Sequence, residues 1–493
     1  MVNVLQPATG ALDIPAVHGA VDIPGTAQVP VYDKCSGAVL AWVGRADARS
    51  IAAAIGTACE VMKTEPLEPQ RLSDILNSTA DILEIRQELF TETMIGEAGL
   101  TRTDAQSDTK RAVETLRECA EEARRLVGQM VPVHGSRGNH HRLGFTIRVP
   151  VGPVCALTPF NSPLNTVAHK VGPALAAGNP VLLKPSELTP ISAYHLAEAF
   201  RDGGLPRGWL HVVFGPGAEV GESLLLDGRI KFYSFTGSSR IGAHIHGRIG
   251  PRRGQFELSS IAATIIADDH PIDDIIDPIA RAAFRKAGQV CTSVQIVLAD
   301  RQRAEEVAER LAVAAETMVV GDPSDEATSI GPMISCNTAE CAEGKVKAAV
   351  ASGARALTAV KRQGAFLWPV VLTDVTGDMD VVATEMFAPV VSVIPYDSFG
   401  EALDLVSAIP SGLSAGVYTH SWQRALRAAR HLPVGVVQIN ETSSSRVDRM
   451  PFGGQGTSGY GKEGPRYAME ELTEERLVIF NGPRDEMWGT VSP

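Results

Sequence analysis

The sequence lacks any run of about 20 uninterrupted apolar residues, so it predicts no helix that spans a membrane. Its first residues, Met1 to Gln6, also lack the charged region and the apolar stretch of a secretory signal. Cysteine is sparse, with seven among 493 residues, and this odd number indicates reduced thiols rather than a disulfide framework. We therefore expect a soluble, cytoplasmic protein.

Long basic segments are absent as well. The densest patch, Arg248 to Arg253, is interrupted by Gly250 and Pro251. The 45 basic and 57 acidic residues give a formal net charge of -12, which opposes binding to a phosphate backbone. We expect neither nucleic acid nor a membrane among the partners.

The sequence also shows no convincing set of metal ligands. His244 and His246 stand two apart on a predicted helix and therefore point to different faces. Cys336 and Cys341 stand five apart in a polar segment, without a second pair of ligands. The sequence thus predicts no metal site.

The order of predicted helices and strands indicates the fold class. A chain of this length exceeds what one hydrophobic core supports, which indicates two or three packed domains. From Gly152 to Gly242, short apolar strands such as Val154 to Leu157 alternate with helical periods. A second series of helices and strands extends from Asp274 to about His431. The pattern predicts two α/β domains with parallel sheets, whose ligands bind at the carboxyl ends of the strands.

Three side chains stand out as candidates for catalysis. Cys291 lies in a turn of small polar residues, where an exposed thiolate would be a strong nucleophile. Glu257 lies between two apolar residues, and partial desolvation there would raise its pKa toward that of a general base. Asn161 follows a predicted strand and could donate its amide to a developing oxyanion.

Each of these residues also has an ordinary structural explanation. Cys291 could be a buried core thiol, which is the common state of free cysteines. Glu257 could be a solvated strand residue, and Asn161 or Ser162 could cap a helix ahead of Pro163. Taken singly, none of the three signals decides between catalysis and structure.

Two further segments indicate a nucleotide site. Lys184 and Glu187 follow a predicted strand and could bind the ribose hydroxyls of a nucleotide, with Glu187 repelling a 2′-phosphate. The segment Phe235 to Gly242 follows a later strand and opens a helix, so its backbone amides can face a pyrophosphate. Its glycine spacing differs from the usual dinucleotide fingerprint, so alone it is a weak signal.

The order of these motifs along the chain is more specific than any one of them. In this order and spacing they resemble the aldehyde dehydrogenase superfamily, from about residue 30 to the tail, which is nearly the whole chain. The series is Asn161, Lys184, Glu187, Gly237, Glu257 and Cys291, followed by the segments 385–389 (EMFAP) and 451–454 (PFGG).

The resemblance implies the fold of that superfamily, an α/β architecture with three parts. A Rossmann-like cofactor domain would comprise residues 1–128 and 149–257, and an α/β catalytic domain residues 258–465. A small β oligomerisation arm with the tail would comprise residues 129–148 and 466–493. Because this arm pairs with the tail of a partner subunit in the family, we expect a homodimer or a homotetramer.

The resemblance also implies a mechanism. Cys291 would attack an aldehyde to form a thiohemiacetal, while the Asn161 side chain and the Cys291 backbone N–H hold the oxyanion. Hydride would pass to NAD(P)+, and Glu257 would activate the water that hydrolyses the resulting thioester. Lys170 matches a lysine on the proton path of this base. Members that transfer the acyl group to coenzyme A usually lack the base, so Glu257 favours release of a free carboxylic acid.

For the cofactor, the resemblance and Glu187 together predict NAD, with NADP as the alternative. Glu385 and Phe387 match residues that hold the nicotinamide ribose and ring. The complete set of expected cofactor contacts is Thr158, Pro159, Phe160, Lys184, Ser186, Glu187, Gly217, Gly221, Phe235, Gly237, Ser238, Leu258, Glu385 and Phe387.

The sequence departs from the family pattern beside the predicted base. Two glycines usually follow the glutamate and leucine, whereas here Ser259 and Ser260 follow Glu257-Leu258. Their Cβ atoms restrict the backbone, which puts the usual movement of this base in question.

The predicted substrate contacts are small or basic. Ser162 stands where many members carry a bulky aromatic residue, which predicts a wider or more polar funnel. The segment 446–451 (RVDRMP) resembles members that act on small anionic aldehydes such as phosphonoacetaldehyde, and on lactaldehyde-like substrates. Its arginine could take a carboxylate or phosphonate in two parallel hydrogen bonds, or could form a salt bridge with Asp448 or another neighbour. The full set is Ser162, Asn165, Val290, Thr292 and Arg446.

The charge that we predict for the substrate depends on which arginines of related enzymes this sequence lacks. Phosphonate-handling relatives carry further arginines where this chain has Val290 and Gln106. With Arg446 alone remaining, the sequence predicts a small polar or monoanionic (semi)aldehyde. The alternatives are an aromatic or neutral aliphatic aldehyde, a coenzyme A-acylating semialdehyde dehydrogenase, and a catalytically silent member of the family.

Overall fold

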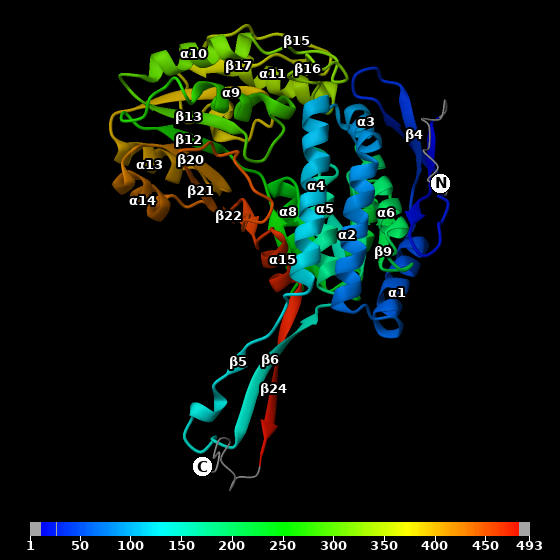
Figure 1. Cartoon of the computed structure of the whole chain (residues 1–493). Coiled ribbons are helices and arrows are strands. Elements are labelled where there is room, and N and C mark those ends of the chain that lie inside the picture. Colours follow the sequence, from blue (N-terminus) through cyan, green and yellow to red (C-terminus); the bar gives the residue numbers. More distant parts are fainter. Residues whose placement is uncertain (1–10, 26, 483–493) are drawn as a thin grey trace.

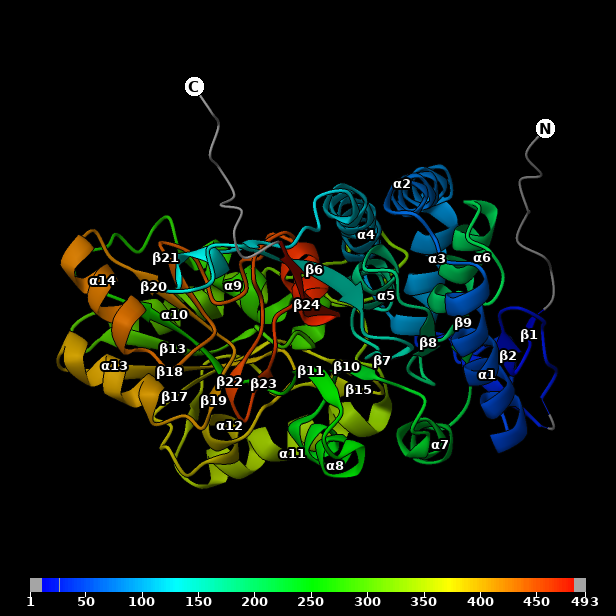
Figure 2. The same cartoon turned by 90° about the horizontal axis from the view of Figure 1, so that it is seen from below.

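The computed structural model describes residues 11–25 and 27–482, which form two α/β bodies and a protruding arm (Figure 1). Each body is built on a seven-stranded sheet. Seen from below, helices α1 to α6 of the first body lie to one side and α10, α13 and α14 of the second body to the other (Figure 2). Among the described residues, no helix is both long and apolar enough to cross a membrane.

The first sheet has the order β2-β9-β8-β7-β10-β11-β23, with five parallel inner strands and two antiparallel edge strands. Its strands are β2 (Val17–His18), β9 (Leu210–Val213), β8 (Val181–Lys184), β7 (Val154–Leu157), β10 (Phe232–Thr236), β11 (Arg253–Glu257) and β23 (Gly459–Tyr460).

Helices cover both faces of this sheet, which explains why its inner strands are apolar throughout. On β7, Val154 and Ala156 enter one core, while Cys155 and Leu157 enter the other, because alternate residues of a strand point to opposite faces. The first core contains α2 (Pro69–Ile85), α3 (Gln87–Ala98), α4 (Arg102–Ala123), α5 (Asn165–Ala176) and α6 (Ile191–Asp202), and the second contains α1 (Ala48–Thr64), α7 (Glu222–Leu226) and α8 (Ser239–Ile249).

The second sheet has the order β14-β17-β18-β13-β12-β20-β21, and all its pairs except β14 with β17 are parallel. Its strands are β14 (Arg355–Ala356), β17 (Val370–Thr373), β18 (Val390–Tyr396), β13 (Val294–Asp300), β12 (Ala262–Ile266), β20 (Ser414–Tyr418) and β21 (Val436–Ile439). The helices that accompany it are α9 (Ile276–Phe284), α10 (Ala304–Glu316), α11 (Cys336–Ala351), α12 (Asp380–Ala383), α13 (Phe399–Ser407) and α14 (Trp422–His431).

Three smaller sheets complete the bodies. One lies near the N-terminus. The other two are short two-stranded sheets formed by residues of the second half of the chain. Their strands are β1 (Leu12–Ile14), β4 (Val39–Gly44) and β3 (Gln28–Tyr32), then β15 (Arg362–Gln363) with β16 (Phe366–Leu367), and β19 (Ser411–Gly412) with β22 (Gln455–Gly456).

The C-terminal segment divides between the first body and the arm. Helix α15 (Pro465–Glu471) packs in the first body, where Ala468, Met469 and Leu472 are buried in its core. Residues 466–472, which the sequence assigns to the tail, therefore lie in this body, and the arm strand begins only at Thr473. Residues 483–493 of the expected tail lie outside the described residues.

The arm is a three-stranded antiparallel sheet that extends away from both bodies (Figure 1). It comprises β5 (Met130–Val131), β6 (Arg142–Pro150) and β24 (Thr473–Asn481), with β24 at one edge. Both faces expose apolar side chains, since Leu477 and Ile479 lie on one face of β24 and Phe480 on the other. An exposed apolar edge strand favours pairing with another chain.

We expect the purified chain to associate through this arm. Light scattering should give a molar mass that is twice or four times the 52.3 kDa of one chain. Replacing Leu477 and Ile479 together by aspartate should shift the protein toward the monomer, because two carboxylates would then have to be buried in the interface. Glu474→Gln, on the exposed part of the same strand, is the control and should leave the mass unchanged. A monomeric wild-type protein would contradict this expectation.

Candidate active site

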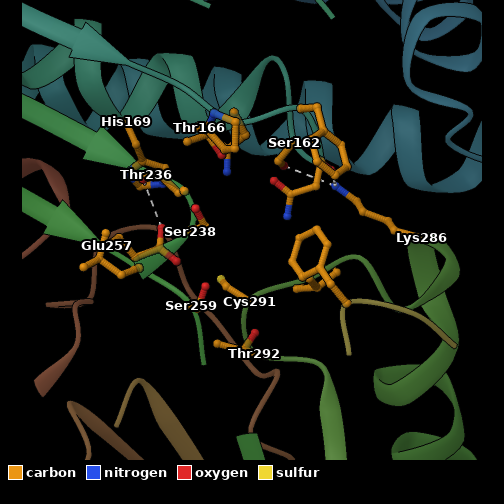
Figure 3. Close-up of a pocket in the computed structure, with 18 of the residues that line it drawn as sticks. Ser162, Thr166, His169, Thr236, Ser238, Glu257, Ser259, Lys286, Cys291 and Thr292 are labelled. Carbon is orange, nitrogen blue, oxygen red and sulfur yellow. Dashed lines mark hydrogen bonds between the residues drawn. The ribbon is translucent and has the colours of Figure 1, made fainter. Parts of the chain in front are cut away.

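A cavity of about 460 Å³ lies between the two bodies, where strands β7, β10 and β11 end (Figure 3). Residues 258–261 cross here from β11 of the first sheet to β12 of the second. Most of the residues that the sequence predicts for the site line this cavity. They are Pro159, Phe160, Asn161, Ser162, Asn165, Phe235, Gly237, Ser238, Glu257, Leu258, Val290, Cys291, Thr292, Glu385, Phe387 and Arg446.

The other predicted residues lie outside this cavity. Ser186 and Glu187 line a smaller cavity of about 90 Å³ beside β3 and β4. The rest are Thr158 and Lys184 at the ends of β7 and β8, Lys170 on α5, and Gly217 and Gly221 at the two ends of a π-helical turn.

Cys291 follows a short left-handed stretch of backbone. Lys286, Ala287 and Gly288 have φ values of 53°, 52° and 69°. A Cβ atom at Gly288 would lie 2.1 Å from the carbonyl oxygen of Ala388, so only glycine fits there. This turn leaves the Cys291 N–H without a hydrogen-bond partner among the residues that the structure describes. The N–H is thus available to an acceptor in the cavity.

The Glu257 carboxyl is buried beside the half-buried Cys291 thiol. Burial and the negative charge of Glu257 raise the pKa of the Cys291 thiol well above its ordinary value. Burial and the nearby Glu463 raise the pKa of the Glu257 carboxyl. In Figure 3, Thr236 and Glu257 lie on one side of Cys291, and Ser162 and Lys286 on the other. A thiol and a carboxyl placed together in this way can exchange a proton.

Asn161 does not cap the helix that follows it. Helix α5 starts at Asn165, and the N–H groups of Leu164 and Asn165 donate to the buried carboxylate of Asp108 (3.4 and 3.1 Å). The Asn161 amide nitrogen instead donates to the carbonyl oxygen of Gln289 (2.8 Å). Because an amide nitrogen carries two hydrogens, the second remains for another acceptor. The helix-capping explanation for Asn161 is thereby excluded.

A buried carboxylate that the sequence did not single out, Glu463, ties the site together. It accepts hydrogen bonds from Lys170 Nζ (3.0 Å) and Arg446 Nη2 (2.9 Å), and the Thr236 hydroxyl lies 3.4 Å away. Burial alone would raise its pKa, but these two cations hold that pKa far below the ordinary value. Its only sequence signal was that it is the one acidic residue of the glycine-rich loop 451–464.

The two serines that replace the usual glycines are held by hydrogen bonds. Ser259 Oγ accepts from the N–H of Ser239 (3.2 Å), and the Ser259 carbonyl accepts from Ser458 Oγ (2.8 Å). The N–H of Ser260 donates to Glu385 (3.0 Å). These bonds anchor the backbone directly after Glu257, so the carboxyl approaches Cys291 from a well-defined position.

The substrate part of the cavity is more basic than the sequence predicted. Arg111, Arg285 and Lys286 line it in addition to Arg446, whereas Gln106 is exposed on α4. Arg446 is the one arginine that remains at the positions used by phosphonate-handling relatives, but Arg111, Arg285 and Lys286 were not predicted from the sequence. The adjacent Arg285 and Lys286, directly before the glycine turn, were the signal in the sequence.

Arg446 does form a salt bridge, but with Glu463 rather than with Asp448. Its guanidinium also lies over the ring of Phe452, 3.9 Å from the ring centre. Asp448 pairs instead with Arg111, through two hydrogen bonds of 2.6 and 3.0 Å. Long-range partners of this kind are invisible to local sequence patterns.

The residues that the sequence predicts to bind the adenosine part of the cofactor form a polar cradle. Lys184 Nζ donates to the Glu187 carboxylate (3.0 Å). Burial would raise the pKa of Glu187, but the charge of Lys184 holds it below the ordinary value. A Cβ atom at Gly217 would lie 3.8 Å from that Nζ and 3.9 Å from the carboxylate, so the glycine turn faces this pair. Ser238 caps the N-terminus of α8, which is a favourable end for a phosphate.

Phe387 reaches the cavity from the second body. Its φ of 47° is rare for a bulky residue, which indicates that the surroundings impose this conformation. The ring meets Phe160 edge to face, with ring centres 5.8 Å apart. Glu385, two residues earlier, is a carboxyl whose pKa burial raises. The two residues predicted for the nicotinamide side thus face the first body across the cavity.

Comparison with known proteins agrees with this architecture. The chain is 44% identical over 428 residues to a 3-sulfolactaldehyde dehydrogenase of Priestia aryabhattai, covering 87% of this chain and 90% of the relative. It is 34% identical over 426 residues to a lactaldehyde dehydrogenase of Methanocaldococcus jannaschii, covering 86% and 90%. The crystal structure of aldehyde dehydrogenase 21 from Physcomitrella patens, in complex with the reaction product succinate, superposes with a TM-score of 0.93 at 32% identity.

That structural match covers 96% of this chain and 99% of the Physcomitrella patens protein, which confirms the fold expected from the sequence. The model of the aldehyde dehydrogenase family matches residues 23–478. The chain therefore belongs to the aldehyde dehydrogenase family.

Proposed function

We propose that the chain oxidises a small polar or monoanionic aldehyde to the free carboxylic acid with NAD(P)+. The observation that carries the proposal is the meeting of Cys291, Glu257 and Asn161 in the wall of one cavity. A thiol, a carboxyl with raised pKa and an amide donor supply the nucleophile, the base and the oxyanion contact that this reaction needs.

The first step is attack by Cys291. Its thiol gives its proton to Glu257 while Sγ forms a bond to the aldehyde carbon, and the carbonyl electrons move to the oxygen. The second amide hydrogen of Asn161 and the Cys291 N–H donate to this oxyanion. NAD(P)+, when bound, supplies the hydride acceptor, and loss of hydride converts the thiohemiacetal into a thioester.

The second half-reaction is hydrolysis. Glu257 takes a proton from water, the oxygen of that water bonds to the thioester carbon, and the Cys291 sulfur departs as the acid forms. Glu257 must lose its first proton before this step. The Thr236 hydroxyl lies between Glu257 (3.2 Å) and Glu463 (3.4 Å), and Lys170 contacts Glu463, so these groups supply a buried proton path. Lys170 acts through Glu463 and is a positioning residue.

The adenosine cradle would hold the cofactor. Lys184, Ser186 and Glu187 would contact the ribose, and the Gly217–Gly221 turn and the N-terminus of α8 the phosphates. The remaining contacts would be Thr158, Pro159, Phe160, Phe235, Gly237, Leu258, Glu385 and Phe387. Half of the Glu187 side chain is exposed, and its negative charge opposes a 2′-phosphate, so we propose a preference for NAD over NADP.

The relatives support a short, polar substrate. By their names two of them act on 3-sulfolactaldehyde and lactaldehyde, and succinate is the reaction product of the Physcomitrella patens enzyme. These molecules are short, and two of the three carry an anionic group. The basic side chains of the cavity wall, Arg285 among them, give this part of the site the positive charge that an anionic group requires.

The direct test is NADH formation by the purified protein with a panel of neutral, aromatic, hydroxylated, carboxylated and sulfonated aldehydes. We expect turnover of short polar aldehydes without coenzyme A, and the loss of turnover to background in Cys291→Ala. Cys35→Ala, which removes an exposed thiol, is the matched control and should retain full activity. Strict dependence on coenzyme A, or unchanged activity in Cys291→Ala, would overturn the proposed mechanism.

The role of Glu257 can be separated from that of Cys291. In Glu257→Gln we expect a burst of NADH that is slower than in the wild type, because Cys291 must then give its proton to solvent. Steady turnover that is about a hundredfold to ten-thousandfold slower should follow, because hydrolysis lacks its base. Hydroxylamine, an external nucleophile, should restore steady turnover by cleaving the thioester. In the wild-type protein, kcat should fall on the acid side of its pH profile at a pH above the pKa of an ordinary glutamate. The reason is that the pKa of Glu257 is raised and the base must be ionised for hydrolysis. An unchanged steady rate in the variant would exclude this role.

In this proposal, the preference for NAD over NADP depends on the negative charge of Glu187. Glu187→Gln should raise kcat/KM with NADP+ relative to NAD+ by about tenfold, because it removes the repulsion of a 2′-phosphate. Initial rates with the two cofactors measure this ratio. Glu65→Gln, which removes an exposed carboxylate at the C-terminal end of α1, serves as the control for a general change in surface charge. An equal ratio in wild type and Glu187→Gln would assign cofactor choice to other residues.

A further inference from the structure

The positive charges that line the substrate side of the cavity are matched by carboxylates, with one exception. The exception is Arg285, for which no carboxylate lies within ion-pairing distance among residues 11–25 and 27–482. The matched pairs are Arg111 with Asp448, Lys286 with Asp108, and Arg446 with Glu463, all with nitrogen–oxygen distances of 3.0 Å or less.

Arg285 lies at the C-terminal end of α9 and turns its guanidinium into the cavity wall. Its Nη2 donates one hydrogen bond, to the hydroxyl of Ser444 (2.8 Å). Burial lowers the pKa of Arg285, and the charge of Asp104 opposes that effect. The Asp104 carboxylate accepts hydrogen bonds from the Thr101 hydroxyl and the Lys286 N–H. A guanidinium stays protonated in such a place, so the charge of Arg285 is present and unpaired.

A largely desolvated cation without a counterion is unfavourable in the free protein. A guanidinium has five N–H donors in a planar fork, and Arg285 uses one of them in the bond to Ser444. A bound anion would match both the charge and the unused donors. We propose that Arg285 and Ser444 form the subsite for the anionic group of the substrate, and that this group carries a single negative charge. This inference rests on the proposed function, in which Cys291 attacks the aldehyde end.

The subsite lies close to the nucleophile. The Ser444 hydroxyl that receives the Arg285 bond lies 3.3 Å from the hydroxyl of Thr292, the residue directly after Cys291. An aldehyde with its carbonyl at Cys291 and its anion at Arg285 therefore has only a few bonds between the two groups.

The neighbouring cations cannot fill this role equally well. Lys286 has three ammonium hydrogens, and its Nζ donates to Asp108, to the carbonyl of Asn161 and to Ser162, at 3.0, 3.2 and 3.2 Å. These contacts leave the Lys286 ammonium without a free donor. Lys286 thus shapes the wall of the cavity instead of binding the anion.

Arg446, the arginine that the sequence favoured, is also engaged. It is paired with Glu463 and stacked on Phe452. Its Nε–H has no partner in the part of the chain that the structure describes, but this nitrogen is buried and out of reach of a substrate. The charge of Arg446 is already matched. One unmatched cation in the cavity selects a monoanion such as a sulfonate or a carboxylate, whereas a dianion would bring an excess negative charge toward Glu257.

The kinetic test compares aldehydes that differ in charge. Lactaldehyde is neutral, 3-sulfolactaldehyde and succinic semialdehyde each carry one charge, and glyceraldehyde 3-phosphate carries nearly two. Arg285→Met should lower kcat/KM for both monoanions by about 30- to 100-fold, and that for lactaldehyde by less than about threefold. Arg281→Met, on the exposed side of the same helix, should change neither value. Equal losses for lactaldehyde and the monoanions would overturn the proposed subsite. A preference of the wild-type protein for glyceraldehyde 3-phosphate would overturn the proposal that the bound group carries a single negative charge.

Thermal stability separates a binding role from a structural one. Arg285→Met should raise the melting temperature, because an apolar side chain replaces an unpaired charge. Arg446→Met should lower it, because one of the two cations that match the buried Glu463 is lost. A structural role for Arg285 predicts instead that its loss lowers the melting temperature, and that result would count against the subsite.

A binding measurement tests the subsite independently of turnover. Butyrate, a monoanion with the carbon chain length of succinic semialdehyde, should raise the melting temperature of Cys291→Ala but not that of the double variant Cys291→Ala/Arg285→Met. If the wild-type protein oxidises no aldehyde while this difference persists, the proposed function fails and the anion subsite stands. If butyrate stabilises both variants equally or neither, the anion subsite is overturned whatever the result of the kinetics.

Discussion

The ion-pair cluster around Glu463 is the interaction on which the site depends. A buried carboxylate is tolerated only when cations match it, and here Lys170 and Arg446 do so from two different segments of the chain. The same negative charge raises the pKa of Glu257, the proposed base. The cluster thus sets both the protonation of the base and the position of an arginine in the substrate wall.

The cluster also joins the two bodies. Lys170 lies on α5 of the first body, Arg446 follows the last strand of the second sheet, and Glu463 lies on the segment that returns to the first body. The left-handed turn before Cys291 adds a second constraint, because Gly288 packs against the backbone at Ala388. These contacts close the cavity between the two sheets and bring the thiol to the base.

Charge matching gives the substrate side its chemical character. Three of its basic side chains are held by carboxylates and act as walls, while Arg285 is left with a hydroxyl partner. A protein that keeps an unpaired cation in such a place loses stability that a better-packed apolar residue would give. The proposed anionic substrate is the physical reason for keeping it.

Much of the fold could be predicted from the sequence, because strand and helix periodicities are local properties. The alternation after Gly152 and the order of motifs around Asn161, Glu257 and Cys291 indicated the parallel sheets and the family, and the comparisons confirm both. The residues of the cavity wall were predicted less completely. Arg285 was visible as a basic residue before the glycine turn, but nothing local showed that it faces the cavity.

The sequence by itself determined the fold class, the family and the candidate nucleophile and base, since each of these depends on residue type and spacing along the chain. Only the tertiary structure decided which charges are matched. Asp448 pairs with Arg111, and Glu463 with Lys170, across more than two-thirds and more than half of the chain. Ion pairing depends on distances in space, which no local pattern encodes, so the unpaired state of Arg285 appears only when the chain is folded.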